Sequence, residues 1–181
     1  MPIFVRMKPL HGCLSIIVIC LLAACRQDKP QDNEYVQGAY RIHMKQLNDS
    51  LHMLFLDMNG QTCDSMELPY PVYRFDCGDL TGDGVPEICI GVVKPTRYWP
   101  MGRRLFIYHL FCRRYIRPLW MGSRVGRPLL DFTVCRDSVP ACIHTEECGP
   151  DSTIIRNEYI LQGFGLQFSK RLVEPANPPI P

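Results

Sequence analysis

Residues 79–87, with the sequence DLTGDGVPE, place oxygen donors at the spacing of a calcium-binding loop. Positions 1, 3, 5 and 9 are Asp79, Thr81, Asp83 and Glu87, glycine stands at position 6, and position 7 offers the carbonyl of Val85. Calcium takes six to eight oxygen ligands, and a tightly curled loop can turn alternate residues inward around one ion. An EF-hand is excluded, because position 12 is Ile90 and both flanks alternate like strands.

The segment 79–90, preceded by VYRFD at 72–76, resembles the calcium loop of FG-GAP and VCBS repeats of integrin-type propellers and secreted bacterial β proteins. The resemblance implies that the five residues named above hold a structural Ca²⁺. Thr81 stands where those repeats usually have Asn, and Glu87 where they usually have Asp. The alternative is a metal-free turn, in which the carboxylates accept backbone N–H groups and Gly84 adopts a positive φ.

Seven cysteines lie beyond residue 60, an odd number that leaves at least one of them unpaired. Exported proteins form disulfides, and the spacing suggests two pairs. Cys77 and Cys89 flank the calcium-type loop, while Cys135 and Cys142 fall opposite each other if a short turn joins two strands. Buried free thiols are the alternative for each pair.

Zinc and catalytic chemistry have weaker support. Ligands of a suitable type for zinc are Cys135, Cys142, His144 and Cys148, but the usual short spacing between paired cysteines is missing. The chain has no G-x-S-x-G, H-E-x-x-H or Walker sequence, and its histidines are scattered. We therefore expect a non-enzymatic protein. The rival hypothesis is a hydrolase or carbohydrate-processing accessory with a cleft near the calcium-type loop.

The middle of the chain is basic, since residues 88–130 contain no Asp or Glu and nine cations: Lys94, Arg97, Arg103, Arg104, Arg113, Arg114, Arg117, Arg124 and Arg127. Arginine beside aromatic rings can bind anionic or sugar ligands. The candidate ligand-binding residues are Arg97, Trp99, Arg103, Arg104, Arg113, Arg114, Arg117 and Trp120. If they form one face, we expect a polyanion partner such as acidic polysaccharide, lipid headgroups or an envelope protein. The alternative is solvating arginines beside a core tryptophan.

Nucleic acid is not an expected partner. The formal net charge of +2 is lost if Arg6 and Lys8 leave with an N-terminal leader. A chain without an overall positive field lacks the main driving force for phosphate contacts.

Cys25 ends the sequence LAAC, which resembles the lipobox of bacterial lipoproteins. A basic segment and an apolar run at 14–22 precede it, as in a cleaved leader. The resemblance implies cleavage before Cys25, palmitate-type acylation and anchoring in the cell envelope, with an ordinary signal peptide or an uncleaved anchor as the alternative. Arg26 differs from the Asp that retains enteric lipoproteins in the inner membrane, which favours the outer membrane. With YIRPLW at 115–120, the chain also resembles small lipoproteins of Bacteroidetes.

Period-two alternation dominates the chain and predicts an all-β fold. We expect about nine or ten short antiparallel strands in a meander, arranged as propeller-like blades or as a sandwich. The strands assigned are 40–44, 51–56, 72–77, 87–93, 105–111, 129–135, 142–146, 154–161 and 164–169, with a hairpin at Asn59-Gly60. Residues 88–93 and 105–111 are apolar on both faces and should be central.

The expected organisation has four parts: a leader at 1–24, a lipidated tether at 25–34, one β domain at 35–173 and a proline-rich tail at 174–181. The tether is polar, and proline in the tail prevents a helix or a central strand.

Overall fold

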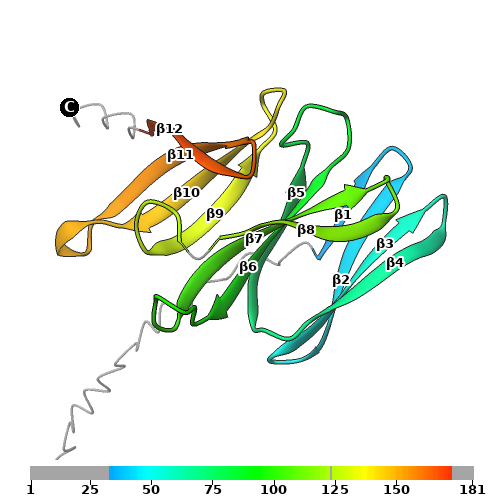
Figure 1. The fold of residues 1–181 in the computed structure, drawn as a ribbon, viewed down its shortest axis with the longest axis horizontal. Coiled ribbons are helices and arrows are strands. Elements are labelled where there is room, and N and C mark those ends of the chain that lie inside the picture. Colours follow the sequence, from blue (N-terminus) through cyan, green and yellow to red (C-terminus); the bar gives the residue numbers. More distant parts are fainter. Residues whose placement is uncertain (1–32, 123, 173–181) are drawn as a thin grey trace, which may run out of the picture.

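The computed structural model describes residues 33–122 and 124–172, which form an all-β fold (Figure 1). Its twelve strands are β1 (Glu34–Gln37), β2 (Tyr40–Asn48), β3 (Leu51–Met58), β4 (Gln61–Leu68), β5 (Val72–Gly78), β6 (Glu87–Lys94), β7 (Gly102–Phe111), β8 (Tyr115–Met121), β9 (Leu129–Cys135), β10 (Cys142–Cys148), β11 (Ile154–Gln162) and β12 (Gly165–Arg171). The predicted leader, Cys25, the tether up to residue 32 and the tail at 174–181 lie outside the described residues.

The strands form two antiparallel sheets, one with the order β1-β2-β3-β4 and a larger one with the order β12-β11-β10-β9-β7-β6-β5, where β8 also pairs with β7. Within the larger sheet, β9 meets β7 at a single residue pair, Arg103 and Leu129. The chain is therefore a series of three four-stranded meanders. Figure 1 shows β5–β8 between the other two. The arrangement is sandwich-like rather than a closed barrel.

Two hydrophobic cores lie between the three meanders and pack them together. The first lies between β1–β4 and β5–β8 and contains residues such as Leu54, Ile88 and Tyr108. The second lies between β5–β8 and β9–β12 and contains Leu105 and Phe132, among others. Because strand residues alternate between faces, β6 and β7 contribute to both cores. This confirms the prediction that 88–93 and 105–111 are central.

Local turn chemistry explains several hairpins. Asn59 and Gly60 have φ values of 52° and 79°, as a two-residue hairpin requires, and they join β3 to β4. The structure adds β1, β4 and β8 to the predicted strands. Phe164, which was predicted to begin the last strand, lies instead in the turn before β12 and is 93% exposed.

Candidate functional site

The calcium-type loop joins β5 to β6 and is closed by its own hydrogen bonds. Asp79 Oδ1 accepts the backbone N–H groups of Gly82 at 2.6 Å and Asp83 at 3.1 Å, and its Oδ2 accepts that of Gly84 at 2.8 Å. Both glycines have φ near +80°, which L side chains rarely adopt. Asp83 Oδ1 accepts the N–H of Val85 at 2.9 Å. These bonds match the metal-free turn that the sequence left open.

Glu87, the residue predicted at loop position 9, is only 3% exposed. Its Oε2 accepts the N–H groups of Leu80 at 2.7 Å and Thr81 at 3.2 Å. Burial raises the pKa of this carboxyl to about 7, and the nearby negative charges of Asp83 and Asp79 add to the rise. A cation bound beside it would favour the ionised carboxylate and so lower the pKa of Glu87.

The donor types of this loop suit calcium, but their geometry is that of a hydrogen-bonded turn. Among the described residues, the one group of three or more His, Cys, Asp and Glu whose ligand atoms lie within 4.8 Å of one another is elsewhere in the molecule. The carboxylates of Asp79, Asp83 and Glu87 therefore do not converge as a set. Binding of calcium here stays a prediction that requires the side chains to turn inward.

The basic segment does not form one face. Arg103 and Arg104 begin the ten-residue β7, whereas Arg113 and Arg114 lie in the turn after it. A strand rises about 3.4 Å per residue, so the two pairs are separated by roughly 30 Å. The polyanion-binding face predicted from residues 97–127 is therefore divided into two ends.

Several of these arginines also have partners within the protein. Arg104 is 7% exposed and donates to the carbonyl of Pro100 at 2.6 Å. Arg103 donates to the carbonyl of Leu130, and Arg117 lies 3.5 Å from the Asp64 carboxylate. Arg97 is exposed beside its neighbour Tyr98. These positions correspond to the solvating and structural roles that the sequence left as the alternative.

The end of the basic segment, Arg124 and Arg127, contributes to a hollow on the third meander. This pocket has a volume of about 670 Å³ and is bordered by the β8 end, the loop at 124–127 and strands β10–β12. Trp120, Leu166 and Phe168 supply an apolar wall, while Arg124, Arg127 and Arg171 supply positive charge. Arg124 lies 4.4 Å from the ring centroid of Trp99, which places the other predicted tryptophan beside the same loop. We call this hollow the Glu147 pocket, after the residue at its base.

The floor of the pocket is the buried carboxylate of Glu147, which accepts four hydrogen bonds. Glu147 is fully buried, and its Oε1 accepts hydrogen bonds from the Thr145 hydroxyl at 2.7 Å, the Tyr159 hydroxyl at 2.9 Å and the Asn157 amide at 3.0 Å. Its Oε2 accepts the backbone N–H of Arg127 at 2.7 Å. Such bonds compensate the cost of burying a charged group. They also fix the loop at 124–127 over the sheet.

Asn157 has one atom without a partner. Its amide nitrogen is committed to Glu147, but its Oδ1 is buried and has no hydrogen-bond partner within the described chain. Leaving a buried acceptor unpaired costs about 1–3 kcal/mol. The side chain is 6% exposed and borders the pocket, so the Glu147 pocket combines an unpaired acceptor, three cations and an aromatic wall.

Sequence reasoning selected Trp120 but missed the base of the pocket. One signal was present, because period two from Ile143 through Thr145 puts Glu147 on the core-facing side of its strand. A glutamate at such a position needs buried donors. Thr145 lies on the same strand, but the other donors come from β11 and a loop, which alternation does not identify.

The cysteines give one correction and one partial agreement. Cys77 lies in the first core and Cys89 contributes to the second, so their side chains point to opposite faces, and both are free. The predicted bond between them is wrong, since Cys77 pairs in register with Ile88. Cys135 and Cys142 are directly opposite, as expected, and are free thiols in this structure.

The rival hydrolase hypothesis requires a histidine beside the calcium-type loop. In the described residues, the hydrogen-bond partners of Asp79 and Asp83 are backbone groups of the loop. His144 instead contacts Cys142 and Glu158, on a different strand pair. The structure offers no acid–histidine pair at the loop in the part of the chain that it describes.

Helices that could cross a membrane are not found among the described residues. Comparison of the chain with known protein families, with curated proteins and with solved structures gives no match. We therefore infer the function from the geometry of the described residues and from the sequence signals at the N-terminus.

Proposed function

We propose that this protein is a lipid-anchored component of a bacterial cell envelope, in the outer membrane, that binds acidic glycans in the Glu147 pocket without enzymatic chemistry. The anchor follows from the lipobox-like LAAC at 22–25. The binding role is supported chiefly by one observation. The floor of the pocket, formed by the buried Glu147 carboxylate and by Asn157 with its unpaired Oδ1, lies beneath arginines and an aromatic wall.

The chemistry of an acidic sugar complements each part of this pocket. The ring of a sugar has an apolar face that packs against tryptophan. A sugar hydroxyl can donate to Asn157 Oδ1 once the side chains that cover this buried atom move aside. A uronate carboxylate matches the planar fork of an arginine such as Arg127. A neutral glycan would bring no anionic partner to the arginines, so we expect selectivity for the acidic class.

Calorimetric titration of the detergent-solubilised protein with polygalacturonate, and with dextran as the neutral comparison, tests this function. We expect binding of the acidic polymer alone, and weaker binding as salt screens the charges. Arg127→Ala removes one charge-assisted contact and should weaken binding about ten- to hundredfold. The backbone N–H of Arg127 that holds Glu147 is retained in this variant.

Arg113→Ala is the matched control, because it removes the same charge at the far end of β7. Its affinity should equal that of the unmodified protein. Equal losses in the two variants would show that general positive charge, rather than the pocket, binds the polymer. Binding of dextran with similar affinity would contradict the acidic class.

We also propose that residues 79–87 hold a structural calcium ion, with Asp79, Thr81, Asp83, the Val85 carbonyl and Glu87 as the ligands. These ligands are hard oxygen donors, which suit a calcium ion that neutralises the loop carboxylates and stabilises the fold. Support comes from the buried Glu87 carboxyl, whose ionisation a cation would favour.

A further inference from the structure

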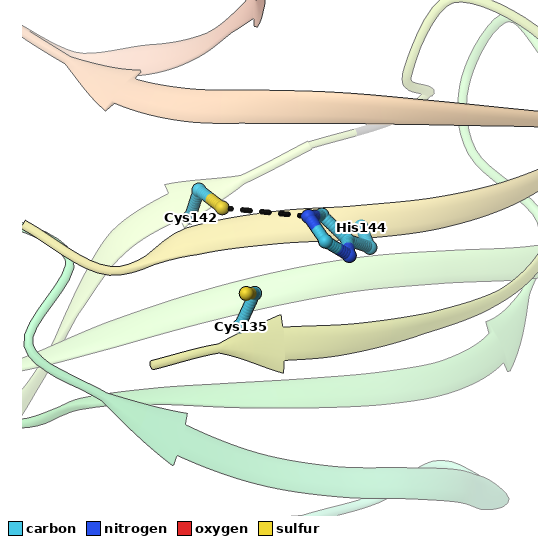
Figure 2. A group of neighbouring side chains, drawn as sticks. All are labelled: Cys135, Cys142 and His144. Atoms are coloured by element: carbon cyan, nitrogen blue, oxygen red, sulfur yellow. Dashed lines mark hydrogen bonds between the residues drawn. The ribbon is translucent and has the colours of Figure 1, made fainter. Parts of the chain in front are cut away.

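We propose that Cys135, Cys142, His144 and Glu158 form a binding site for zinc(II) on the face of the third meander opposite the Glu147 pocket. Figure 2 shows the two cysteines on neighbouring strands with the histidine beside them. Strand alternation separates the two sites, since Ile143, Thr145 and Glu147 point to the other side of β10. The inference does not depend on the glycan-binding proposal.

Strand register brings the first three donors together. Cys135 ends β9, Cys142 begins β10, and the two residues are paired directly across the hairpin. His144 is two residues further along β10, so its side chain emerges on the same face. The two sulfur atoms and a His144 ring nitrogen lie within 4.8 Å of one another. The sequence spacing looked wrong for zinc because pairing of strands, rather than a short loop, joins the ligands.

The fourth donor comes from β11. Glu158 is paired with His144, and its Oε2 lies 3.3 Å from His144 Nε2. It lies outside the set of three whose ligand atoms are all within 4.8 Å of one another, so its carboxylate must turn toward the sulfur atoms to join them. Cys148, which the sequence suggested as the fourth ligand, lies six residues along β10 from Cys142 and is not part of the group. Two thiolates, one imidazole and one carboxylate are a ligand combination that zinc accepts in a tetrahedral site.

The spacing of the donors fits this coordination. Zinc lies about 2.3 Å from sulfur and about 2.0–2.1 Å from nitrogen or oxygen, so tetrahedral angles separate nitrogen and sulfur ligands by about 3.6 Å and nitrogen and oxygen ligands by about 3.3 Å. Cys142 Sγ lies 3.6 Å from His144 Nε2, and Glu158 Oε2 lies 3.3 Å from the same nitrogen. Two of the ligand spacings therefore suit an ion already, and rotation of the Glu158 carboxylate toward the sulfur atoms would complete the site.

The ligand groups are also close enough to perturb one another's pKa. Burial raises the pKa of the Cys142 thiol to about 12, and the negative charge of Glu158 and the neighbouring Cys135 add to the rise. Burial also acts to raise the pKa of Glu158, but hydrogen bonds from Ser169, Lys170 and His144 hold it below its usual value. A bound cation would have to displace the Cys142 proton, and its charge would offset the repulsion between the thiolate and the Glu158 carboxylate.

The charges and protons of zinc binding can be accounted for. Zn²⁺ would displace one proton from each cysteine, releasing two protons, and take a lone pair from neutral His144. With the Glu158 carboxylate, the filled site would carry a single negative charge. Lys170 Nζ, 3.3 Å from Glu158 Oε2, lies where it can compensate that charge. Its side chain is 62% exposed and can move aside as the carboxylate turns to the ion.

Cobalt(II) titration of the detergent-solubilised full chain, reduced with a phosphine, is the direct test. A tetrahedral cobalt–thiolate site gives intense visible absorption and sulfur-to-metal charge transfer, which Zn²⁺ should abolish by displacement. Cys135→Ser and His144→Ala should each weaken binding more than a hundredfold. Glu158→Gln should weaken it at least about tenfold, since loss of even an outer-shell partner has an effect of this size at other metal sites.

Cys148→Ser is the matched control and should bind cobalt with unchanged affinity, because Cys148 lies outside the group. Far-UV circular dichroism of each metal-free variant verifies that it is folded, and the partly exposed Cys135 and His144 are preferred to the buried Cys142 for this reason. Absence of charge transfer in the reduced, unmodified chain overturns the proposal. Loss of binding in Cys148→Ser, with Cys135→Ser unchanged, would assign the metal to other thiols and also overturn it.

Discussion

Two buried glutamates show how single residues shape this protein. Glu147 receives donors from two side chains of β11, one of β10 and a loop N–H. Glu87 has two backbone donors from its own loop and two other carboxylates nearby. Burial is the main cause that raises the pKa of Glu87 from 4.5 to about 7; the two carboxylates add to the rise, and the backbone donors oppose it. This shift couples the stability of the fold to pH.

In EDTA, we expect the free energy of unfolding to fall as pH rises from about 4.5 to 7. The unfolded chain loses the Glu87 proton near pH 4.5, while the folded chain retains it to about pH 7, so the folded state binds more protons in this window. The loss is at most on the order of 3 kcal/mol. Denaturant unfolding at several pH values should show a smaller fall in Glu87→Gln. An unchanged pH dependence in that variant, relative to the exposed-site control Glu67→Gln, would contradict the shift.

At the scale of elements, the loop at 79–87 links all three meanders. It joins β5 to β6, the Gly84 carbonyl accepts a hydrogen bond from the Gln37 side chain of β1, and the Asp79 carbonyl accepts the Ala141 N–H just before β10. Order in this loop should therefore stabilise the whole fold rather than one hairpin. An ion that draws its carboxylates inward would act at that junction.

Calcium should raise the melting temperature relative to EDTA, and Asp83→Ala should abolish the rise. An ion at one hundred times its dissociation constant stabilises the fold by about 2.7 kcal/mol, or roughly 5–10 °C for a domain of this size. Differential scanning fluorimetry measures the shift, and magnesium is the control for non-specific ionic effects. If the unmodified protein melts at the same temperature in calcium and EDTA, the loop is the metal-free turn alone.

At the scale of the whole molecule, the third meander carries two chemically different faces. The face toward β5–β8 contributes to the second core and ends in the Glu147 pocket, while the opposite face carries the cysteines and His144. A ligand and a metal ion could therefore be bound at the same time. Acylation of Cys25, as proposed above, would hold both sites at a membrane.

Cys25→Ala should abolish labelling with a palmitate analogue and move the protein from the detergent phase to the aqueous phase on Triton X-114 partition. Each buried methylene contributes about 0.8 kcal/mol of membrane affinity, so loss of the acyl chains removes most of the attachment. Cys20→Ala, within the same apolar segment, should keep both properties. Continued labelling of Cys25→Ala would exclude this residue as the acylation site.

Local patterns in the sequence determined the strands with two-residue alternation, the Asn59-Gly60 hairpin and the opposition of Cys135 and Cys142. These features depend on neighbours in the chain. The missed strands β1, β4 and β8 are all edge strands, with one paired side and weaker apolar patterns, and β8 contains Pro118.

Only the tertiary structure decided which faces meet. It placed Cys77 and Cys89 in different cores, divided the arginines between the two ends of β7, and brought Asn157 to Glu147 and Glu158 to His144. Alternation predicts which residues share a face of a strand. Which other segment packs against that face depends on contacts between parts that are far apart in the chain. Both candidate sites use such partners, and for this reason their complete sets of donors could not be read from spacing.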